Sequence, residues 1–242
     1  MKKTILLLIV LLSIGINISA QNTIVQDTVK EETKLEKTLE SESKDRLFLV
    51  LNHDNLFHKE TNGFATQWYS RGVGFYFMYD VQIKESEFSI APGIGYNHVA
   101  YYHNASLVED SSGISFPTIF DLKKDETFKR SKMSLHYLEV PVELRYRHKF
   151  DNGMSLKIAA GLKGSLKISA SSKEVKIGPN GYAKHYNTTN YKDFNTWRLG
   201  PTFRAGYGPV NLLLYYDLLP LMKKGRGPIM NPFSIGIAIT TL

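Results

Sequence analysis

The stretch SLHYLEVPVELRYRHKF, residues 134–150, alternates between two kinds of side chain. Its even positions from 138 to 146 hold leucines, valines and a tyrosine. Its odd positions hold Tyr137, Glu139, Pro141, Glu143, Arg145 and Arg147. Successive side chains of a β-strand point to opposite faces, so the stretch predicts a strand with one apolar and one charged face. The apolar face would cover the core of a soluble sandwich, or would face lipid in a membrane barrel whose lumen holds the charges.

Seven further segments alternate in the same way, and their lengths favour a membrane barrel. They are residues 46–57, 69–81, 87–103, 154–170, 194–207, 210–220 and 232–242. Most reach the roughly 9–11 residues that a tilted membrane strand needs. Strands of soluble proteins usually run to about five or six residues.

The connections between these segments alternate between long and short. Long or medium connections cover 58–67, 104–131, 171–192 and 221–230, and short turns cover 82–86, 151–153 and 208–209. Outer-membrane barrels have short periplasmic turns and long outer loops. With both ends of the chain in the periplasm, every short turn falls on the periplasmic side.

The polar faces of the segments are rich in glycine. The glycines concerned are Gly72, Gly74, Gly93, Gly95, Gly161, Gly200 and Gly236. Small residues leave room inside a narrow barrel, whereas they weaken a strand that faces solvent. We therefore expect residues 46–242 to form an all-β, eight-stranded, antiparallel, up-and-down transmembrane β-barrel with short periplasmic turns and long outer loops.

The first 45 residues contain two further segments. Residues 1–20 combine Lys2 and Lys3 with a short apolar run and end in Ile-Ser-Ala, which predicts a secretory signal peptide cleaved after Ala20. An uncleaved membrane anchor is the alternative. Residues 21–45 are charged and lack aromatic side chains, which predicts a periplasmic linker, with a short coiled coil or partner-binding helix as the alternative.

Composition narrows the class of protein and of partner. The chain has no cysteine and a formal net charge of +7. Without cysteine it can form no disulfide and carry no lipoprotein anchor. Export argues against nucleic acid as the partner of the positive charge, so an acidic lipid head-group surface is the more natural one. We expect the protein in the cell outer membrane, in contact with its lipid and with lipopolysaccharide.

The turn Asp-Asn-Gly at 151–153 predicts the register of one hairpin and an ion pair within it. If Gly153 takes the left-handed conformation of a three-residue loop, Pro141 faces Lys163. Glu139 and Glu143 then lie diagonally on either side of Lys163, within reach of its long side chain. We therefore predict a buried pair between Lys163 and one of the two glutamates.

A two-residue turn at Gly208-Pro209 predicts a second buried pair. It places Asp217 diagonal to Arg198 on the neighbouring strand. Charged groups stay charged inside a protein only if they are paired. We interpret both pairs as a structural plug of the lumen, with a proton or ion path as the alternative.

No residue pattern predicts a catalytic, cofactor or metal site. The seven histidines are scattered at positions 53, 58, 98, 103, 136, 148 and 185, without metal-ligand spacing. Common catalytic motifs are absent from the sequence. Glu139 and Glu143 lie about 13 Å apart along one strand, too far for the paired carboxylates of a glycosidase.

The segment YLEVPVELRYR, Tyr137 to Arg147, resembles the YLE-[IV]-P-[LV] strand of the PorT-like outer-membrane β-barrel family of Bacteroidetes-type bacteria. The Ser-Ala-Gln end of the signal peptide and the GIGYN stretch at 93–97 are similar too. The resemblance covers about residues 46–242 and implies an eight-stranded outer-membrane barrel. The namesake takes part in protein secretion, which implies a secretion or envelope protein as a further partner. The chain departs from the pattern at Leu242, where such barrels commonly end in an aromatic residue.

We therefore expect a non-enzymatic barrel with a filled lumen that acts through its outer loops or its linker. The outer loops carry basic side chains that would bind lipopolysaccharide phosphates or a secretion partner: Lys123, Lys124, Lys129, Arg130, Lys132, Lys173, Lys176 and Lys184. One alternative is a lipid-A-modifying barrel enzyme that combines His98, His103 or His136 with Ser134 or Ser106. The other is a soluble, lipocalin-like secreted binder.

Overall fold

The computed structural model describes residues 46–58, 64–109, 115–119, 128–177, 183–189, 192–226 and 228–240. The first of the two units of the chain, Met1–Ser43, lies outside them, as do the predicted signal peptide and linker. The described residues form twelve strands: β1 (Leu47–His58), β2 (Arg71–Met78), β3 (Val81–Gln82), β4 (Phe88–His103), β5 (Ala105–Glu109), β6 (Ser115–Ile119), β7 (Phe128–Lys149), β8 (Ser155–Ile177), β9 (Ala183–Thr189), β10 (Trp197–Tyr207), β11 (Val210–Tyr216) and β12 (Met230–Thr240). Within this part of the chain, no helix is long and apolar enough to cross a membrane.

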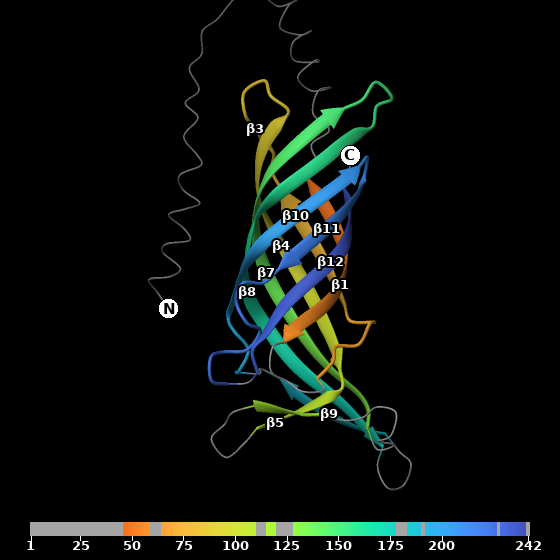
Figure 1. The fold of residues 1–242 in the computed structure, drawn as a ribbon, viewed down its shortest axis with the longest axis vertical. Helices are drawn as coiled ribbons and strands as arrows, with labels where there is room; N and C mark the ends of the chain where they lie inside the picture. The colour runs from red at the N-terminus through yellow and green to blue at the C-terminus, as the bar shows by residue number, and fades with distance from the viewer. Residues whose placement is uncertain are drawn as a thin grey trace, which may run out of the picture. The chain divides into compact units, whose positions relative to one another are not determined.

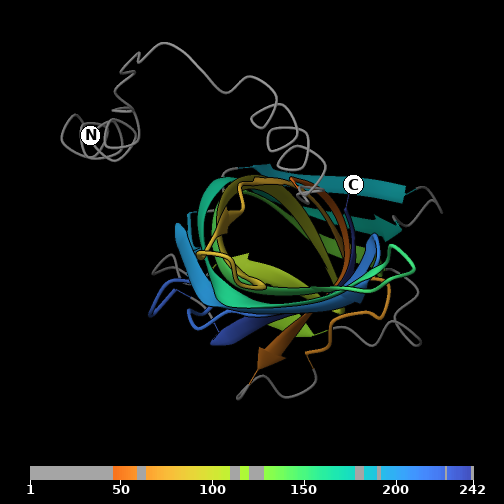
Figure 2. The ribbon, with the colours of Figure 1, turned by 90° about the horizontal axis from the view of Figure 1, so that it is seen from above.

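Eight of these strands close into an antiparallel barrel (Figures 1 and 2). Their order around the wall is β1, β2, β4, β7, β8, β10, β11 and β12, and β12 pairs with β1 to close the ring. Neighbours in the wall are neighbours in the chain, which makes the topology up-and-down. Each of the eight strands overlaps one of the eight alternating segments of the sequence, so the predicted fold is confirmed.

Side chains alternate between the two faces of the wall as the sequence predicts. Val140, Leu162 and Ile237 point outward with exposed fractions of 53%, 55% and 51%, whereas the inward Glu139 is 0% exposed. Large apolar side chains from all eight wall strands are exposed on the outer face in the same way. Such a belt of apolar surface is typical of a wall that faces lipid.

The short turns lie at one end of the barrel, the upper end in Figure 1, together with the C-terminal end of β12. At the β7–β8 turn Gly153 has φ 78°, and the Phe150 N–H donates to the Met154 carbonyl at 2.9 Å. At the β10–β11 turn Tyr207 pairs with Val210, and Gly208 has φ 59°. Glycine adopts these left-handed conformations without strain, which fixes both hairpin registers as predicted.

The long connections at the other end contain more strand than the sequence predicts. β5 and β6 form a hairpin inside the predicted 104–131 loop, and β9 pairs with β8 inside the predicted 171–192 loop. β7 and β8 are 22 and 23 residues long and continue past the other strands (Figure 1). An apolar cluster explains the extension, because Met133 and Leu135 of β7 pack there with Phe64 and Phe194 from two connections.

Candidate functional site

The lumen is crossed by a buried polar layer centred on Glu139 of β7. Its carboxylate accepts hydrogen bonds from the Tyr76 hydroxyl at 2.5 Å and the Ser165 hydroxyl at 3.1 Å, and Asn97 Nδ2 lies at 3.4 Å. Lys163 Nζ lies 2.8 Å from Glu139 Oε2. Four donors on one carboxylate offset much of the cost of placing it in a narrow, enclosed lumen.

Arg198 and Asp217 form a second ion pair in this layer. Arg198 Nε lies 2.5 Å from Asp217 Oδ2, and the two side chains are 2% and 0% exposed. The Arg198 guanidinium also stacks on the Tyr137 ring at 4.5 Å. Lys163 Nζ lies 4.1 Å from the Tyr215 ring centroid, so aromatic faces contribute to holding both cations.

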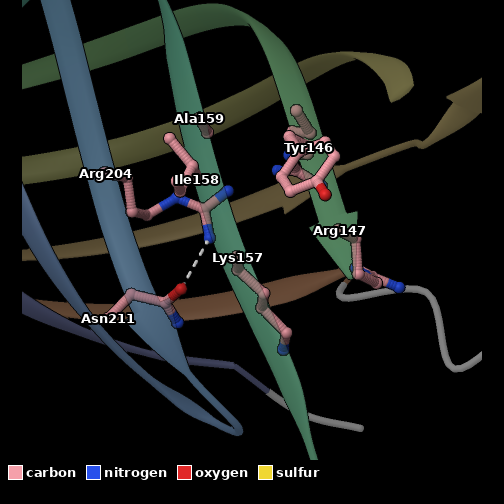
Figure 3. Close-up of a pocket in the computed structure, with 8 residues that line it drawn as sticks. Tyr146, Arg147, Lys157, Ile158, Ala159, Arg204 and Asn211 are labelled. Carbon is pink, nitrogen blue, oxygen red and sulfur yellow. Dashed lines mark hydrogen bonds between the residues drawn. The ribbon is translucent and has the colours of Figure 1, made fainter. Parts of the chain in front are cut away.

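A second charged layer lies nearer the short turns and is built around Glu143. Its Oε2 accepts from Arg204 Nη2 at 2.6 Å and from Arg145 Nε at 2.9 Å. Arg145 also meets Asp80 at 2.7 Å. Both guanidinium groups lie over the Phe48 ring, at 4.5 Å for Arg204 and 5.0 Å for Arg145. Figure 3 shows Arg204 reaching Asn211 across the lumen side of the wall.

The structure places all five predicted lumen residues inside the barrel and shows which of them form ion pairs. They are Glu139, Glu143, Lys163, Arg198 and Asp217. Lys163 meets Glu139, and Arg198 meets Asp217. Glu143 does not take the predicted alternative role with Lys163, because Arg145 and Arg204 occupy its carboxylate. Glu143 and Arg145 are two residues apart and lie on the same face of one strand, so their spacing could have indicated the contact between them.

Two further lumen residues are absent from the sequence-based expectation. Asp54 is fully buried on β1 and accepts from the Ser234 hydroxyl at 2.5 Å. Arg204 reaches Glu143 across β8, where Gly161 stands between them: Gly161 pairs with Glu143 on one side and with Thr202 on the other. Contacts that cross an intervening strand leave no pattern in the sequence of one hairpin.

The outer face of the β7–β8 extension carries a basic cluster, which we define as Arg130, Lys132 and Lys173. Lys132 pairs in register with Lys173 on one side and with Tyr102 of β4 on the other. Lys132 Nζ and the Arg130 guanidinium each lie 5.9 Å from the Tyr102 ring centroid. Among the described residues, no carboxylate lies within ion-pair distance of this cluster. The side chains of four other predicted loop lysines, at positions 123, 124, 129 and 184, lie outside the described residues.

The candidate histidine–serine pairs of a lipid-modifying enzyme are not brought together in the described part of the chain. His136 Nδ1 lies 2.6 Å from the Tyr96 hydroxyl, and its ring packs on His98 at 4.6 Å. Ser106 donates to Glu174 at 2.5 Å instead. His103 Nε2 lies 3.4 Å from the Ser131 hydroxyl, a pair that the sequence-based reasoning did not select.

Metal-binding groups are absent from the described residues: no three histidine, aspartate or glutamate side chains converge there. The polar layers described above hold charged side chains in pairs of opposite sign rather than as clusters of like ligands. Their chemistry is that of a packed, hydrogen-bonded interior.

A comparison with protein-family models agrees with this architecture. The family model described as "Outer membrane protein beta-barrel domain" matches residues 48–220, from β1 to just beyond β11. Among solved structures, the crystal structure of Ail, the attachment invasion locus protein of Yersinia pestis, is 8% identical to this chain. That match covers 82% of this chain and 100% of the other, with a TM-score of 0.33. No curated protein matches the chain significantly.

Proposed function

The chain belongs to the outer membrane protein beta-barrel domain family and is an outer-membrane barrel protein, and from this premise we propose that it is a non-enzymatic barrel whose outer basic cluster binds lipopolysaccharide phosphates. The protein is located in the outer membrane. We further propose that residues 1–20 are removed as a signal peptide, which N-terminal sequencing of the mature protein would test. The finer assignment to the PorT-like family, with a secretion partner, stays a prediction.

The observation that carries the proposal is the register of Lys132 against Lys173. Like charges directly opposite each other on adjacent strands destabilise a sheet. In this pair no described carboxylate offsets the repulsion, and Arg130 adds a third positive charge nearby. An anion that bridges the three side chains would remove the repulsion, and phosphate groups are anions of suitable charge.

The position of the cluster supports lipopolysaccharide as the source of the phosphate. The cluster lies on the lipid-facing side of the wall, at the end of the barrel with long connections. In outer-membrane barrels that end faces outward, toward the leaflet that holds lipopolysaccharide. Tyr102 and Tyr69, whose rings are 4.8 Å apart, lie beside the cluster and suit the boundary between lipid and head group.

The packed lumen supports a non-enzymatic role and argues against a conduit. Two buried charged layers and the apolar cluster of Phe48, Val50, Tyr76, Met78, Ala91, Leu213 and Ala238 occupy it. An eight-stranded barrel is just wide enough for side chains to fill. Function is then left to surfaces outside the lumen.

Thermal unfolding of the full chain in detergent micelles tests the proposal. Lipopolysaccharide should raise the unfolding temperature of the parent protein, because a ligand that binds only the folded state stabilises it. The variant R130Q/K132Q/K173Q should lose this rise. The charge-matched control R46Q/K84Q/K149Q, at the short-turn end, should keep it. Dephosphorylated lipopolysaccharide should raise the unfolding temperature of none of the three proteins. If R130Q/K132Q/K173Q showed the same rise with lipopolysaccharide as the parent protein, the proposal would be contradicted.

A further inference from the structure

A small cavity lies inside the barrel, between the two charged layers of the lumen. It borders Lys163 of the first layer, and Glu143 and Arg204 of the second. Apolar side chains of the wall, among them Phe48 and Leu213, form much of the remaining lining. These residues are all buried, so the cavity belongs to the interior of the barrel.

The size of the cavity restricts what can occupy it. It offers about 30 Å³ to molecules of the size of water. One buried water molecule needs roughly 10–15 Å³ of such space, so the cavity holds about two. A phosphate group, a sugar or an acyl chain is too large to enter. Cavities of this size stay dry when their walls are apolar and bind water when polar groups line them.

Thr202 of β10 contributes a hydroxyl group to this lining. The residue is 6% exposed, and its Oγ1 has no hydrogen-bond partner among the described residues. A buried hydroxyl group without a partner costs free energy, because it has given up its bonds to water without replacement. A water molecule in the cavity removes that cost.

Glu143 contributes an acceptor to the same cavity. Arg145 and Arg204 both reach its carboxylate through Oε2, at 2.9 and 2.6 Å. Its other oxygen, Oε1, accepts a hydrogen bond from none of the described residues. A carboxylate accepts through both oxygens, so Glu143 retains capacity for a further donor.

The register explains why Thr202 and Glu143 leave a gap between them. Both are paired with Gly161 of β8, Glu143 from β7 on one side and Thr202 from β10 on the other. Their backbones are therefore two strand spacings apart, or roughly 10 Å. Gly161 places no side chain in the lumen between them. A hydroxyl group and a carboxylate at this separation are suited to a bridge by water.

We infer that this cavity is a water-binding site, and that one or two bound molecules join the two charged layers of the lumen. A water molecule donates two hydrogen bonds and accepts two. It accepts from the Thr202 hydroxyl or the Lys163 ammonium group and donates to the Glu143 carboxylate. The bridge makes the two layers one hydrogen-bonded network, which stabilises the lumen more than two separate layers.

A high-resolution crystal structure of the full chain tests the site directly. Density for one or two water molecules should lie within hydrogen-bond distance of Thr202 Oγ1 and of the Glu143 carboxylate. The variant T202S keeps the hydroxyl group and should keep this density. The variant T202V replaces the hydroxyl group by a methyl group of similar shape and should lose the water molecule that Thr202 binds.

Urea unfolding in phospholipid vesicles adds a test whose sign depends on the water. If water satisfies the hydroxyl group, T202V breaks that hydrogen bond and should unfold at a lower urea concentration than the parent protein. If the cavity is dry, the same substitution removes an unsatisfied buried group and raises the midpoint. T196V exchanges an exposed threonine beside β10 in the same way and should leave the midpoint unchanged.

A mobility shift between unboiled and boiled samples checks that each variant is folded. The inference is overturned if the cavity of the parent protein shows no water density, or if T202V unfolds at the same or a higher urea concentration than the parent. If T202V does not fold, the density in the parent protein and in T202S decides. Density in both supports the site, and its absence from either overturns the inference.

Discussion

Lys163 and Glu139 meet in the middle of the lumen, with Nζ 2.8 Å from Oε2 and side chains that are 5% and 0% exposed. They lie on neighbouring strands, displaced by one diagonal step, since Lys163 faces Pro141 in the register. The carboxylate has three further donors, whereas the ammonium group has two aromatic faces beside it. The two charges therefore depend on each other to different degrees.

This asymmetry predicts unequal costs for removing either charge. Glu139→Gln leaves the Lys163 ammonium without its carboxylate in an enclosed site, and should lower the free energy of unfolding by about 3–5 kcal/mol. Lys163→Met leaves Glu139 with the hydroxyl donors of Tyr76 and Ser165, and should cost less. Urea unfolding of the refolded barrel in phospholipid vesicles, followed by circular dichroism, measures both values.

The double variant E139Q/K163M provides the control for this pair. Its cost should be smaller than the sum of the two single costs, because no charge is left alone. Additive costs would contradict the mutual dependence of the two groups.

The sequence predicted the register of this pair but left the choice between Glu139 and Glu143 open. Both glutamates lie one diagonal step from Lys163, so local geometry alone favours neither. The choice is made by Arg204, which reaches Glu143 from β10, with the whole of β8 between them. The residues of a turn determine the register of its own hairpin. The contact between Arg204 and Glu143 depends instead on how far the Arg204 side chain extends across Gly161.

The extension of β7 and β8 shows a second limit of reasoning from sequence. Alternation identified the segments that cross the barrel, because lipid on one side and a packed lumen on the other impose a strict period of two. Beyond the barrel that constraint ends. Met133 and Leu135 are buried there by Phe64, Phe194 and Leu221, which come from three separate connections. The alternation within a single segment does not indicate which residues of other connections will pack against it.

Gly200 of β10 should not tolerate even the smallest side chain. A Cβ atom at this position would lie 1.8 Å from the Tyr216 carbonyl oxygen, which is backbone and cannot move aside. Gly164→Ala is the matched control, because a Cβ atom there would meet nothing within 4 Å. Gly200→Ala should cost about 1–3 kcal/mol of unfolding free energy, as overpacking of an interior does. Comparable unfolding midpoints in urea for the two variants would show that the wall relaxes around the added methyl group.

The interactions of Glu87 predict a pH dependence of stability at the short-turn rim of the barrel. It lies in the turn before β4, and a hydrogen bond from His148 Nδ1 at 2.6 Å, with one from Tyr146, lowers the pKa of Glu87 below its usual 4.5. A carboxyl group whose pKa falls on folding stabilises the protein above its unfolded pKa, and this contribution disappears as the pH falls through the folded pKa. Glu87→Gln should therefore lower stability slightly at neutral pH and have no effect in strong acid.

Urea unfolding of the parent protein and of Glu87→Gln at a series of pH values measures this difference. Glu85→Gln, a neighbouring exposed substitution in the same turn, is the control and should leave stability unchanged at every pH. The expected difference is small, since Glu87 and His148 are both nearly half exposed and solvent screens their interaction. A difference between Glu87→Gln and the parent that persists in strong acid would contradict the assignment.

Val140 tests whether the outer face of the wall meets lipid. It points outward with an exposed fraction of 53% and lies beside Gly164 near the middle of β7 and β8. Val210 is 51% exposed and is the first residue of β11, next to the short β10–β11 turn. An arginine near the bilayer midplane should cost about 2–4 kcal/mol, and one near the interface about 0–1. Val140→Arg should therefore destabilise the barrel in phospholipid vesicles far more than Val210→Arg. In water both positions would accept arginine at little cost. Equal and small effects of the two substitutions on urea unfolding would therefore mean that this face is solvated rather than lipid-facing.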